Sequence, residues 1–427
     1  MATGLFSRGV AALLALVPTP ILAQSLDECA AQAASQYEAG FASIGRDMGT
    51  MDVTAAVEAC ERALAETTDS AQVKAWLGRA YVWSGEAARA IPLFEEAAAA
   101  DNAVALTLYG DMLIVGEALE PDAARGTQML QRAAGQGFAP AQNSLGLSYD
   151  IGEGVAQDYR EAANWYRRAA MQNLPRAQTN IGLMYFQGLG VDEDPVAAAA
   201  WLQRAAERGE ARAQYNLGRI HQDGLVDAAD EGIAWGYYLA AAEQGDMFGQ
   251  NGLGYLMEHG LGGDANAAMA ADYYGRAAEQ GLAVAQYNLA TLFEVGKGVA
   301  KDEARAFELY AQAAAAGDAD AMVNLGLMYL EGRGTAQDYA QALYWTEQAA
   351  GLGNAIAYNN LGHMHEHGLG VAVDLEAALL NYGLSAELMY PLGIDNDARL
   401  TAAMETPEAP VEQKPLTKPY PPSKLDG

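Results

Sequence analysis

The most constraining feature of this chain is a pattern of 36 residues that recurs eight times between Asn102 and Met389 with no insertion and no deletion. One glycine returns at every period, at Gly116, Gly152, Gly188, Gly224, Gly260, Gly296, Gly332 and Gly368. A fixed period in this range is typical of solenoids, whose units cannot bury their apolar face alone and must stack on one another. Because solenoids mostly serve as binding surfaces, the repeat predicts that the chain holds a partner rather than converts a substrate.

Each repeat has the pattern of two antiparallel helices. In the most regular copy, Ala141, Leu145 and Tyr149 recur every four residues, which is one apolar stripe of a helix. Gly152 follows where a left-handed residue ends a helix, and Asp158 stands where a carboxylate caps the next one, worth about 1 kcal/mol. The capping position is acidic or Asn in every copy, at Asp122, Asp158, Asp194, Asp230, Asn266, Asp302, Asp338 and Asp374. The second helix is predicted to end at Gly137, Asn173, Gly209, Gly245, Gly281, Gly317 and Gly353.

The second helix also carries the residues predicted to pack the core. Alanine pairs such as Ala169-Ala170 allow close approach of neighbouring helices. Four residues earlier a bulky aromatic position is expected to fill the core, at Trp165, Trp201, Tyr237, Tyr273 and Trp345.

Together these motifs resemble the Sel-one-like repeat, a family of the tetratricopeptide-like superfamily, in its exported bacterial type. The resemblance covers residues 102–389 as eight units and implies an all-α, right-handed α-solenoid of stacked antiparallel helix pairs. Some units depart from the pattern: Tyr109 and Ala118 in the first, Val226 in the fourth and Asn381 in the eighth. Such proteins are typically scaffolds in signalling or assembly complexes, and some exported ones resemble regulators of envelope sensors or of exopolysaccharide production.

The flanking segments differ from the array. Residues 71–101 resemble a tetratricopeptide unit, and residues 24–70 are predicted to form an N-terminal helical cap. Residues 390–405 are predicted to be a C-terminal capping segment with a short helix. Residues 406–427 are rich in proline and are predicted to be a disordered tail.

The first residues predict export. Residues 1–23 combine Arg8, a short apolar run and small residues before a cut after Ala23, which is typical of a cleavable signal peptide. No stretch is long and apolar enough to span a bilayer, so no membrane insertion is expected. The mature chain is therefore expected to be periplasmic or secreted. In such a compartment Cys29 and Cys60, the only cysteines, are expected to form a disulfide, although two buried free thiols are the alternative.

The formal net charge of −30 limits the partners. An acidic surface of this kind repels nucleic acid and anionic lipid headgroups. It either attracts basic partners or serves only as a solvated coat that keeps the array dispersed.

Residues that break the repeat give little sign of catalysis. The chain has no phosphate-binding loop and no nucleophile elbow, and its Gly-x-Gly turns lack the strand and lysine of a nucleotide site. No cofactor and no established metal site are predicted. His363 and His367 are spaced to face one side of a helix beside Glu366, which makes them weak metal candidates whose alternative is an ordinary polar groove face.

By resemblance, the first helix of each pair lines the concave face. The position before Leu-Gly holds Asn180, Asn216, Asn288, Asn324 and Asn360. Such an asparagine can bond the backbone of a bound peptide, because its amide both donates and accepts, or it can bond the neighbouring unit. Further groove candidates are Arg212, Tyr215, Arg219, Tyr255 and Tyr287, with Glu258, Glu294, Glu331 and Glu366 making the later units acidic.

The function predicted first is a non-catalytic periplasmic adaptor or scaffold that binds a protein or peptide in the concave groove. One alternative is an enzyme like the cysteine-rich relatives associated with β-lactam hydrolysis, whose paired cysteines and nucleophile motif this chain lacks. The other alternative is a purely structural envelope spacer. The sequence does not indicate an oligomeric state.

Overall fold

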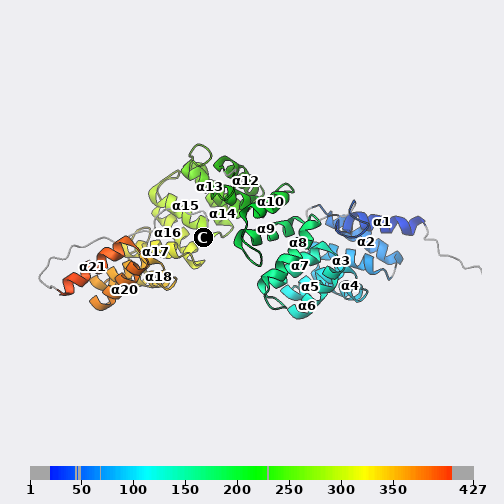
Figure 1. Cartoon of the computed structure of the whole chain (residues 1–427), viewed down its shortest axis with the longest axis horizontal. Coiled ribbons are helices and arrows are strands. Elements are labelled where there is room, and N and C mark those ends of the chain that lie inside the picture. Colours follow the sequence, from blue (N-terminus) through cyan, green and yellow to red (C-terminus); the bar gives the residue numbers. More distant parts are fainter. Residues whose placement is uncertain (1–19, 44–45, 47–49, 68, 228–229, 406–427) are drawn as a thin grey trace, which may run out of the picture. The chain divides into compact units, whose positions relative to one another are not determined.

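The computed structural model describes residues 20–43, 46, 50–67, 69–227 and 230–405 (Figure 1). In these residues the chain forms twenty-one helices and no strand. It divides into two compact units, Met1–Trp201 and Leu202–Gly427, and the boundary falls within a helix. The proline-rich tail and most of the expected signal peptide lie outside the described residues, while the expected cut after Ala23 falls inside the first helix.

The first unit is built of consecutive helices that pack as antiparallel pairs, such as α5 with α6 and α7 with α8 (Figure 1). Its helices are α1 (Pro20–Ala33), α2 (Val53–Thr67), α3 (Ala71–Trp83), α4 (Ala87–Ala99), α5 (Ala103–Val115), α6 (Ala123–Gly135), α7 (Ala139–Ile151), α8 (Tyr159–Met171), α9 (Pro175–Gln187) and the greater part of α10 (Pro195–Ala206).

The second unit repeats the same arrangement and ends in one additional helix. Its helices are α11 (Ala211–Gln222), α12 (Glu231–Glu243), α13 (Met247–His259), α14 (Ala267–Glu279), α15 (Ala283–Val295), α16 (Glu303–Ala315), α17 (Ala319–Glu331), α18 (Tyr339–Gly351), α19 (Ala355–His367), α20 (Leu375–Glu387) and α21 (Pro391–Glu405). Within each unit the second helix of a pair packs on the first helix of the next, as α6 does on α7 and α12 on α13, and the prediction of an all-α solenoid of stacked helix pairs is confirmed.

Helix boundaries follow the residues that the sequence singled out. Gly152 ends α7 in the left-handed conformation, with φ 76°. Asp158 caps α8, because its Oδ1 accepts from the amides of Arg160 and Glu161 at 3.0 and 3.1 Å. These contacts satisfy amides that a helix start leaves free, so the capping pattern marks each turn of the array.

The second glycine of a Gly-x-Gly turn, such as Gly154, allows close packing between helix pairs. A Cβ on Gly154 would lie 2.2 Å from the carbonyl oxygen of Ala123, at the start of the second helix of the preceding pair. In the next repeat, a Cβ on Gly190 would likewise lie 2.2 Å from the backbone of Tyr159, which begins the second helix of the preceding pair. The Gly-x-Gly turn is therefore a contact between successive pairs as well as a bend.

The aromatic core position was assigned one residue too early from the sequence. The side chains at Trp165, Trp201, Tyr237, Tyr273 and Trp345 are only half-buried. The next position of the repeat is the buried one. It holds Leu202 after Trp201, Thr346 after Trp345, and a tyrosine in five other repeats, at Tyr166, Tyr238, Tyr274, Tyr310 and Tyr382.

The shift has a steric reason. The tyrosine ring lies against the glycine of the Leu-Gly pair, where a Cβ on Gly146 would come within 2.7 Å of the Tyr166 ring. The phenol then reaches the end of the first helix, as where Tyr274 Oη donates to Glu258 Oε2 at 3.0 Å.

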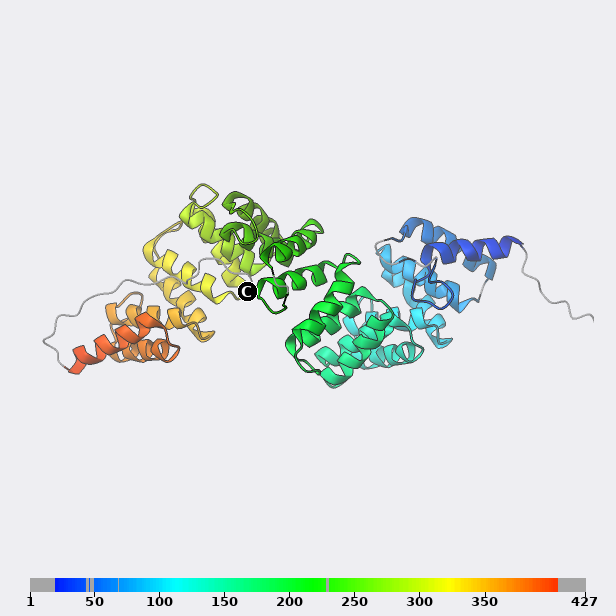
Figure 2. The same ribbon diagram turned by 45° about the horizontal axis from the view of Figure 1, so that its top comes forward.

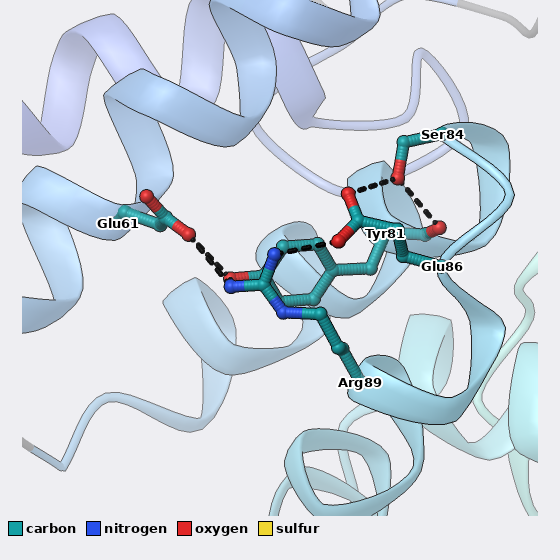
Figure 3. Close-up of polar contacts among 5 residues, drawn as sticks. All are labelled: Glu61, Tyr81, Ser84, Glu86 and Arg89. Atoms are coloured by element: carbon teal, nitrogen blue, oxygen red, sulfur yellow. Dashed lines mark hydrogen bonds and ion pairs between the residues drawn. The ribbon is translucent and has the colours of Figure 1, made fainter.

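The N-terminal cap is fastened covalently and by polar contacts. A disulfide joins Cys29 on α1 to Cys60 on α2, with their Cα atoms 4.6 Å apart, as predicted. Figure 3 shows how α2, α3 and α4 meet around Arg89, whose guanidinium lies 4.0 Å from the Tyr81 ring centre. Arg89 donates to Glu61 at 3.0 Å and to Glu86 at 2.7 Å, while Tyr81 Oη donates to Glu61 at 2.6 Å. This network holds three helices together.

Candidate binding site

The asparagines predicted for the groove mostly lie inside the solenoid. Asn216, Asn288, Asn324 and Asn360 are buried, and Asn180 is half-buried. Asn288 Nδ2 donates to Asn251 Oδ1 of the preceding pair at 3.0 Å. The sequence left two roles open for these asparagines, binding a peptide backbone or bonding the neighbouring repeat. This geometry favours a bond to the neighbouring repeat.

The same bond is formed in the first unit, where Asn180 Nδ2 donates to Asn143 Oδ1 at 3.1 Å. Asn216 instead donates to the carbonyl of Arg212, one turn earlier on its own helix, at 2.7 Å. These amides are therefore engaged within the fold.

The aromatic and basic groove candidates divide by exposure. Tyr287 is fully buried and Tyr215 is 7 % exposed, so both belong to the core. Tyr255 is half-buried with its ring 4.3 Å from that of His259. Arg219 is half-buried and Arg212 is exposed. Asn180 lies in the first unit, and the other groove candidates lie in the second. Of the asparagine, tyrosine and arginine candidates in the second unit, only Arg212 is exposed.

The acidic residues expected to line the later groove are engaged by cations. Glu258 pairs with Lys297 at 2.9 Å, and Glu294 pairs with Arg333 at 2.5 Å. Glu331 also contacts Arg333. Lys297 and the shared Arg333 therefore offset part of the negative charge of these three carboxylates, and the acidic character of the later groove stays a prediction.

The histidine pair in α19 belongs to no group of three potential metal ligands among the described residues. His363 and His367 stack with ring centres 4.2 Å apart, and Nδ1 of His367 lies 3.0 Å from the carbonyl oxygen of His363. Glu366 is held by Arg399 at 2.7 Å and accepts from Tyr382 at 2.8 Å. Burial and the neighbouring His367 lower the pKa of His363 to about 4. No group of three or more potential metal ligands occurs in the described part of the chain.

A segment that the sequence analysis did not single out crosses the first unit. We call residues 34–43, which follow α1, the strap; Figure 2 shows it in dark blue beside α3. Glu38 of the strap accepts from Gln72 Nε2 at 2.6 Å and from Trp76 Nε1 at 3.1 Å. The Phe41 ring meets the Trp76 ring edge-on at 5.0 Å. Gln72 and Trp76 lie one turn apart on α3, so the strap covers one face of that helix.

Both ends of the strap are tied down. Arg79, one turn further along α3, donates to the carbonyl oxygens of Ala33 and Arg46 at 2.7 and 2.6 Å. In the other direction Tyr37 Oη lies 3.5 Å from the carbonyl oxygen of Asn173, which ends the second helix of the α7–α8 pair. The strap thus runs from the α3–α4 pair to the α7–α8 pair.

A cleft of about 630 Å³ lies between the strap and the repeats of the first unit. Its walls are strap residues, the starts of α3 and α5, and the turns that follow α4, α6 and α8. The lining residues are Gln36, Tyr37, Glu38, Ala39, Gly40, Phe41, Ala42, Gln72, Asp101, Asn102, Ala103, Val104, Gln136, Gly137, Phe138 and Gln172. We call this space the strap cleft.

Five carboxamides line the strap cleft, and four of them are fixed in place by hydrogen bonds. Asn102 Nδ2 donates to Gln72 Oε1 at 3.0 Å, and Gln72 Nε2 in turn donates to Glu38 Oε1. Gln136 Nε2 donates to the carbonyl oxygen of Asp101 at 3.0 Å, and Gln172 Nε2 to that of Gly137 at 2.9 Å. Because the amide groups are oriented before any ligand arrives, the cleft presents a fixed polar pattern.

The Glu38 carboxyl group is half-buried under these contacts, and its surroundings shift its pKa. Burial raises the pKa of this carboxyl group, and the hydrogen bonds from Ser35, Trp76 and Gln72 oppose the rise. The carboxylate therefore serves mainly to pin the strap to α3.

Sequence reasoning missed the strap cleft, although part of the signal was readable. Glutamine recurs at one position near the end of the second helix, at Gln136, Gln172, Gln244 and Gln280. In the second unit Gln244 and Gln280 donate to glutamines on the first helix of their own pair, at 2.7 and 2.8 Å, and no described segment there corresponds to the strap. The periodicity explains the amides, whereas the strap depends on a fold between segments far apart in sequence.

Comparison with known proteins identifies the array. The family model of the Sel1 repeat matches residues 103–138, 139–174, 175–210, 211–246, 248–282, 283–318, 319–354 and 355–388. The chain belongs to the Sel1 repeat family. Sel1 repeats form a scaffold typical of protein–protein interaction, and proteins built from them are generally non-catalytic adaptors.

Solved structures of Sel1 repeat proteins resemble this chain over most of its length. A Sel1 repeat protein from Oxalobacter formigenes is 31% identical, with a TM-score of 0.51, over 71% of this chain and 88% of that one. The protein c5321, a protective antigen present in uropathogenic Escherichia coli strains, is 29% identical over 90% of each chain, with a TM-score of 0.49. No curated protein sequence matches the chain. Among the described helices, none has both the length and the apolar character that a bilayer requires.

Proposed function

We propose that this Sel1 repeat protein is a non-catalytic adaptor of the periplasm that holds a segment of a partner protein in the strap cleft. The observation that carries the proposal is the cleft itself: a preformed space of about 630 Å³ lined by oriented carboxamides and aromatic rings. Sites of a few hundred Å³ with a few fixed polar groups are typical of ligand binding, and this volume admits a few residues of a partner segment.

The side chains of the cleft suit a peptide. A carboxamide offers both a donor and acceptors, which matches the alternating groups of an extended backbone. Tyr37, Phe41 and Phe138 add apolar surface for the side chains of that segment. The arrangement contains no paired nucleophile and base, so it supports binding and not turnover.

The periplasmic location rests on the sequence and on the disulfide. Residues 1–23 read as a signal peptide, and a bond such as Cys29–Cys60 persists in oxidising compartments. The same bond removes support for the cysteine-rich enzymatic alternative, because it uses both cysteines of the chain.

The adaptor proposal is tested by photo-crosslinking from inside the cell. A crosslinking residue is placed at Gln136 or Gln172 in the strap cleft, and at Gln244 or Gln280 as matched controls. The controls occupy the same position of their repeats, are exposed, and face no strap. We expect one protein to be captured from the cleft positions and not from the controls. Equal capture from both sets would overturn the proposal.

Export is tested separately by cell fractionation. The full chain expressed with its own N-terminus should be recovered from the periplasm, with a new N-terminus at Gln24 by mass spectrometry. An uncut chain in the cytoplasm would contradict the location and leave the crosslinking result to stand by itself.

A further inference from the structure

We propose that the strap cleft selects a basic segment, with an arginine or lysine side chain of the partner entering between the strap and the repeats. This inference deepens the proposed adaptor function and rests on it. It is carried by the charge of the cleft, by the direction of its hydrogen bonds and by its aromatic walls.

The strap cleft contains acidic groups and no basic ones. Glu38 and Asp101 are among its described lining residues, which include no lysine, arginine or histidine. Arg46, which follows the strap in sequence, donates to the carbonyl oxygens of Ala31 and Thr50 at 2.8 and 3.1 Å. Arg79 likewise donates to backbone carbonyls. A cation from outside therefore meets no positive charge among the described lining residues, although Arg132, outside the lining, pairs with Asp101.

Two of the five carboxamides, those of Gln136 and Gln172, leave an acceptor oxygen open while donating within the fold. Nε2 of Gln136 is bonded to the Asp101 carbonyl, and Nε2 of Gln172 is bonded to Gly137 and to Gln142 Oε1 at 2.8 Å. Within the described residues, neither Oε1 of Gln136 nor Oε1 of Gln172 receives a hydrogen bond. One N–H of Gln136 and both N–H groups of Gln172 are engaged while these two oxygens are open, so this wall of the cleft favours a ligand that donates. Guanidinium and ammonium groups only donate.

Asp101 adds a charge at the mouth of the cleft. Its Oδ1 accepts from Arg132 Nε at 3.1 Å, in an ion pair whose side chains are both well exposed. Such surface pairs contribute little and exchange readily. A partner cation can therefore share this carboxylate without displacing a buried group.

The aromatic residues suit the apolar stem of a basic side chain. Tyr37 and Phe41 are half-buried on the strap side, and Phe138 is nearly buried on the side of the repeats. Arginine and lysine lay their methylene groups along such surfaces, and their charged ends are attracted to ring faces. The strongly negative net charge of −30 further favours the approach of a basic segment.

The test uses three acetylated, amidated pentapeptides that differ only in the central residue, which is arginine, its neutral isostere citrulline, or glutamate, with alanine elsewhere. Binding to the full-length mature protein is followed by NMR titration. We expect the arginine peptide to bind at least tenfold more tightly than the citrulline peptide, and its affinity to fall as salt is raised. Equal affinity for arginine and citrulline peptides would overturn the inference.

Two charge-introducing variants locate the effect. The double variant Q136K/Q172K places cations in the strap cleft, and Q244K/Q280K adds the same charges at the matched positions of the second unit. We expect the first to reduce arginine-peptide binding at least tenfold and the second to leave it unchanged. Circular dichroism of both variants reports whether they fold; a reduction shared by both would also overturn the inference.

The outcomes separate this inference from the adaptor proposal. If a protein is captured from Gln136 but the arginine peptide shows no preference, the adaptor function stands and the basic specificity fails. If capture from Gln136 equals capture from Gln244, the adaptor function fails, whatever the peptides do.

Discussion

At the scale of single residues, the repeated tyrosine links the two helices of a pair. In the α13–α14 pair, Tyr274 donates to Glu258, whose other oxygen pairs with Lys297. We expect Tyr274→Phe to leave a buried carboxylate oxygen without its donor and to destabilise the second unit by about 1–3 kcal/mol. Urea denaturation followed by circular dichroism measures this loss. Tyr344→Phe, at an exposed tyrosine, is the control and should change stability very little.

A pH dependence is expected from Asp111 on α5, a half-buried carboxyl group whose Oδ2 accepts from Ser144 Oγ at 3.2 Å. Burial raises its pKa from 3.8 to about 7, and the hydrogen bond only partly opposes this. Because the folded pKa is raised, the stabilising effect is full below pH 3.8 and is lost as the pH rises through about 7.

The free energy of unfolding of the first unit should therefore fall by about 2–3 kcal/mol between about pH 5 and pH 8 through this group. Asp111→Asn should abolish that part of the pH dependence and should be the more stable protein at the upper end. Chemical denaturation of both proteins across the range decides the point. Parallel curves for the two proteins would show that Asp111 does not carry the effect.

The asparagines show what a sequence leaves undecided at this scale. A polar residue recurring at one position signals a repeated hydrogen bond, and Asn288 makes one to Asn251. Whether the partner is a ligand or the next unit depends on the distance between first helices of successive pairs. That distance is set by side-chain volume along the whole array, which the repeat pattern does not encode.

At the scale of elements, helices and turns were predictable because each has its own local chemistry. Gly152 and Asp158 act within their own turns, so their roles follow from position alone. The buried aromatic position was displaced by one residue, from Trp165 to Tyr166, because two adjacent aromatic residues fit the same stripe. The Gly146 partner decides between them, and only packing reveals it.

The strap was not predictable from local pattern. Its anchors are Trp76, Arg79 and Asn173, and each lies 33 or more residues along the chain from the residue that it contacts in the strap or next to it. No periodicity links them. The strap cleft therefore emerged only from the fold, whereas its glutamines could have been listed from the repeat.

The disulfide is expected to hold the strap indirectly, because Cys29 lies on the helix that leads into it. Replacing both Cys29 and Cys60 by alanine should lower the stability of the N-terminal region by about 3–4 kcal/mol. Hydrogen exchange should accelerate in α1, in the strap and in α2, and stay unchanged in α13 to α19. Uniform acceleration along the whole chain would show that the bond acts on global stability instead.

At the scale of the whole molecule, a repeat array is expected to respond locally to damage, because each pair contacts mainly its neighbours. Leu325 on α17 is almost fully buried. Leu325→Ala should cost about 2–5 kcal/mol and raise hydrogen exchange in α15 to α19, while α3 to α7 keep their protection. Loss of protection in α3 to α7 would instead indicate a single cooperative transition.

The second glycine of each turn has a consequence for how such a chain can change in length. Gly154 and Gly190 press against equivalent backbone atoms of the preceding pair, so the same joint is reused along the array. Excising residues 283–318, one whole period, would bring the α13–α14 pair against the α17–α18 pair, and these surfaces already match. Excising half that length would place a turn where a helix is needed for packing. Growth and shortening by whole periods in the second unit would leave the strap cleft, which belongs to the first unit, chemically intact.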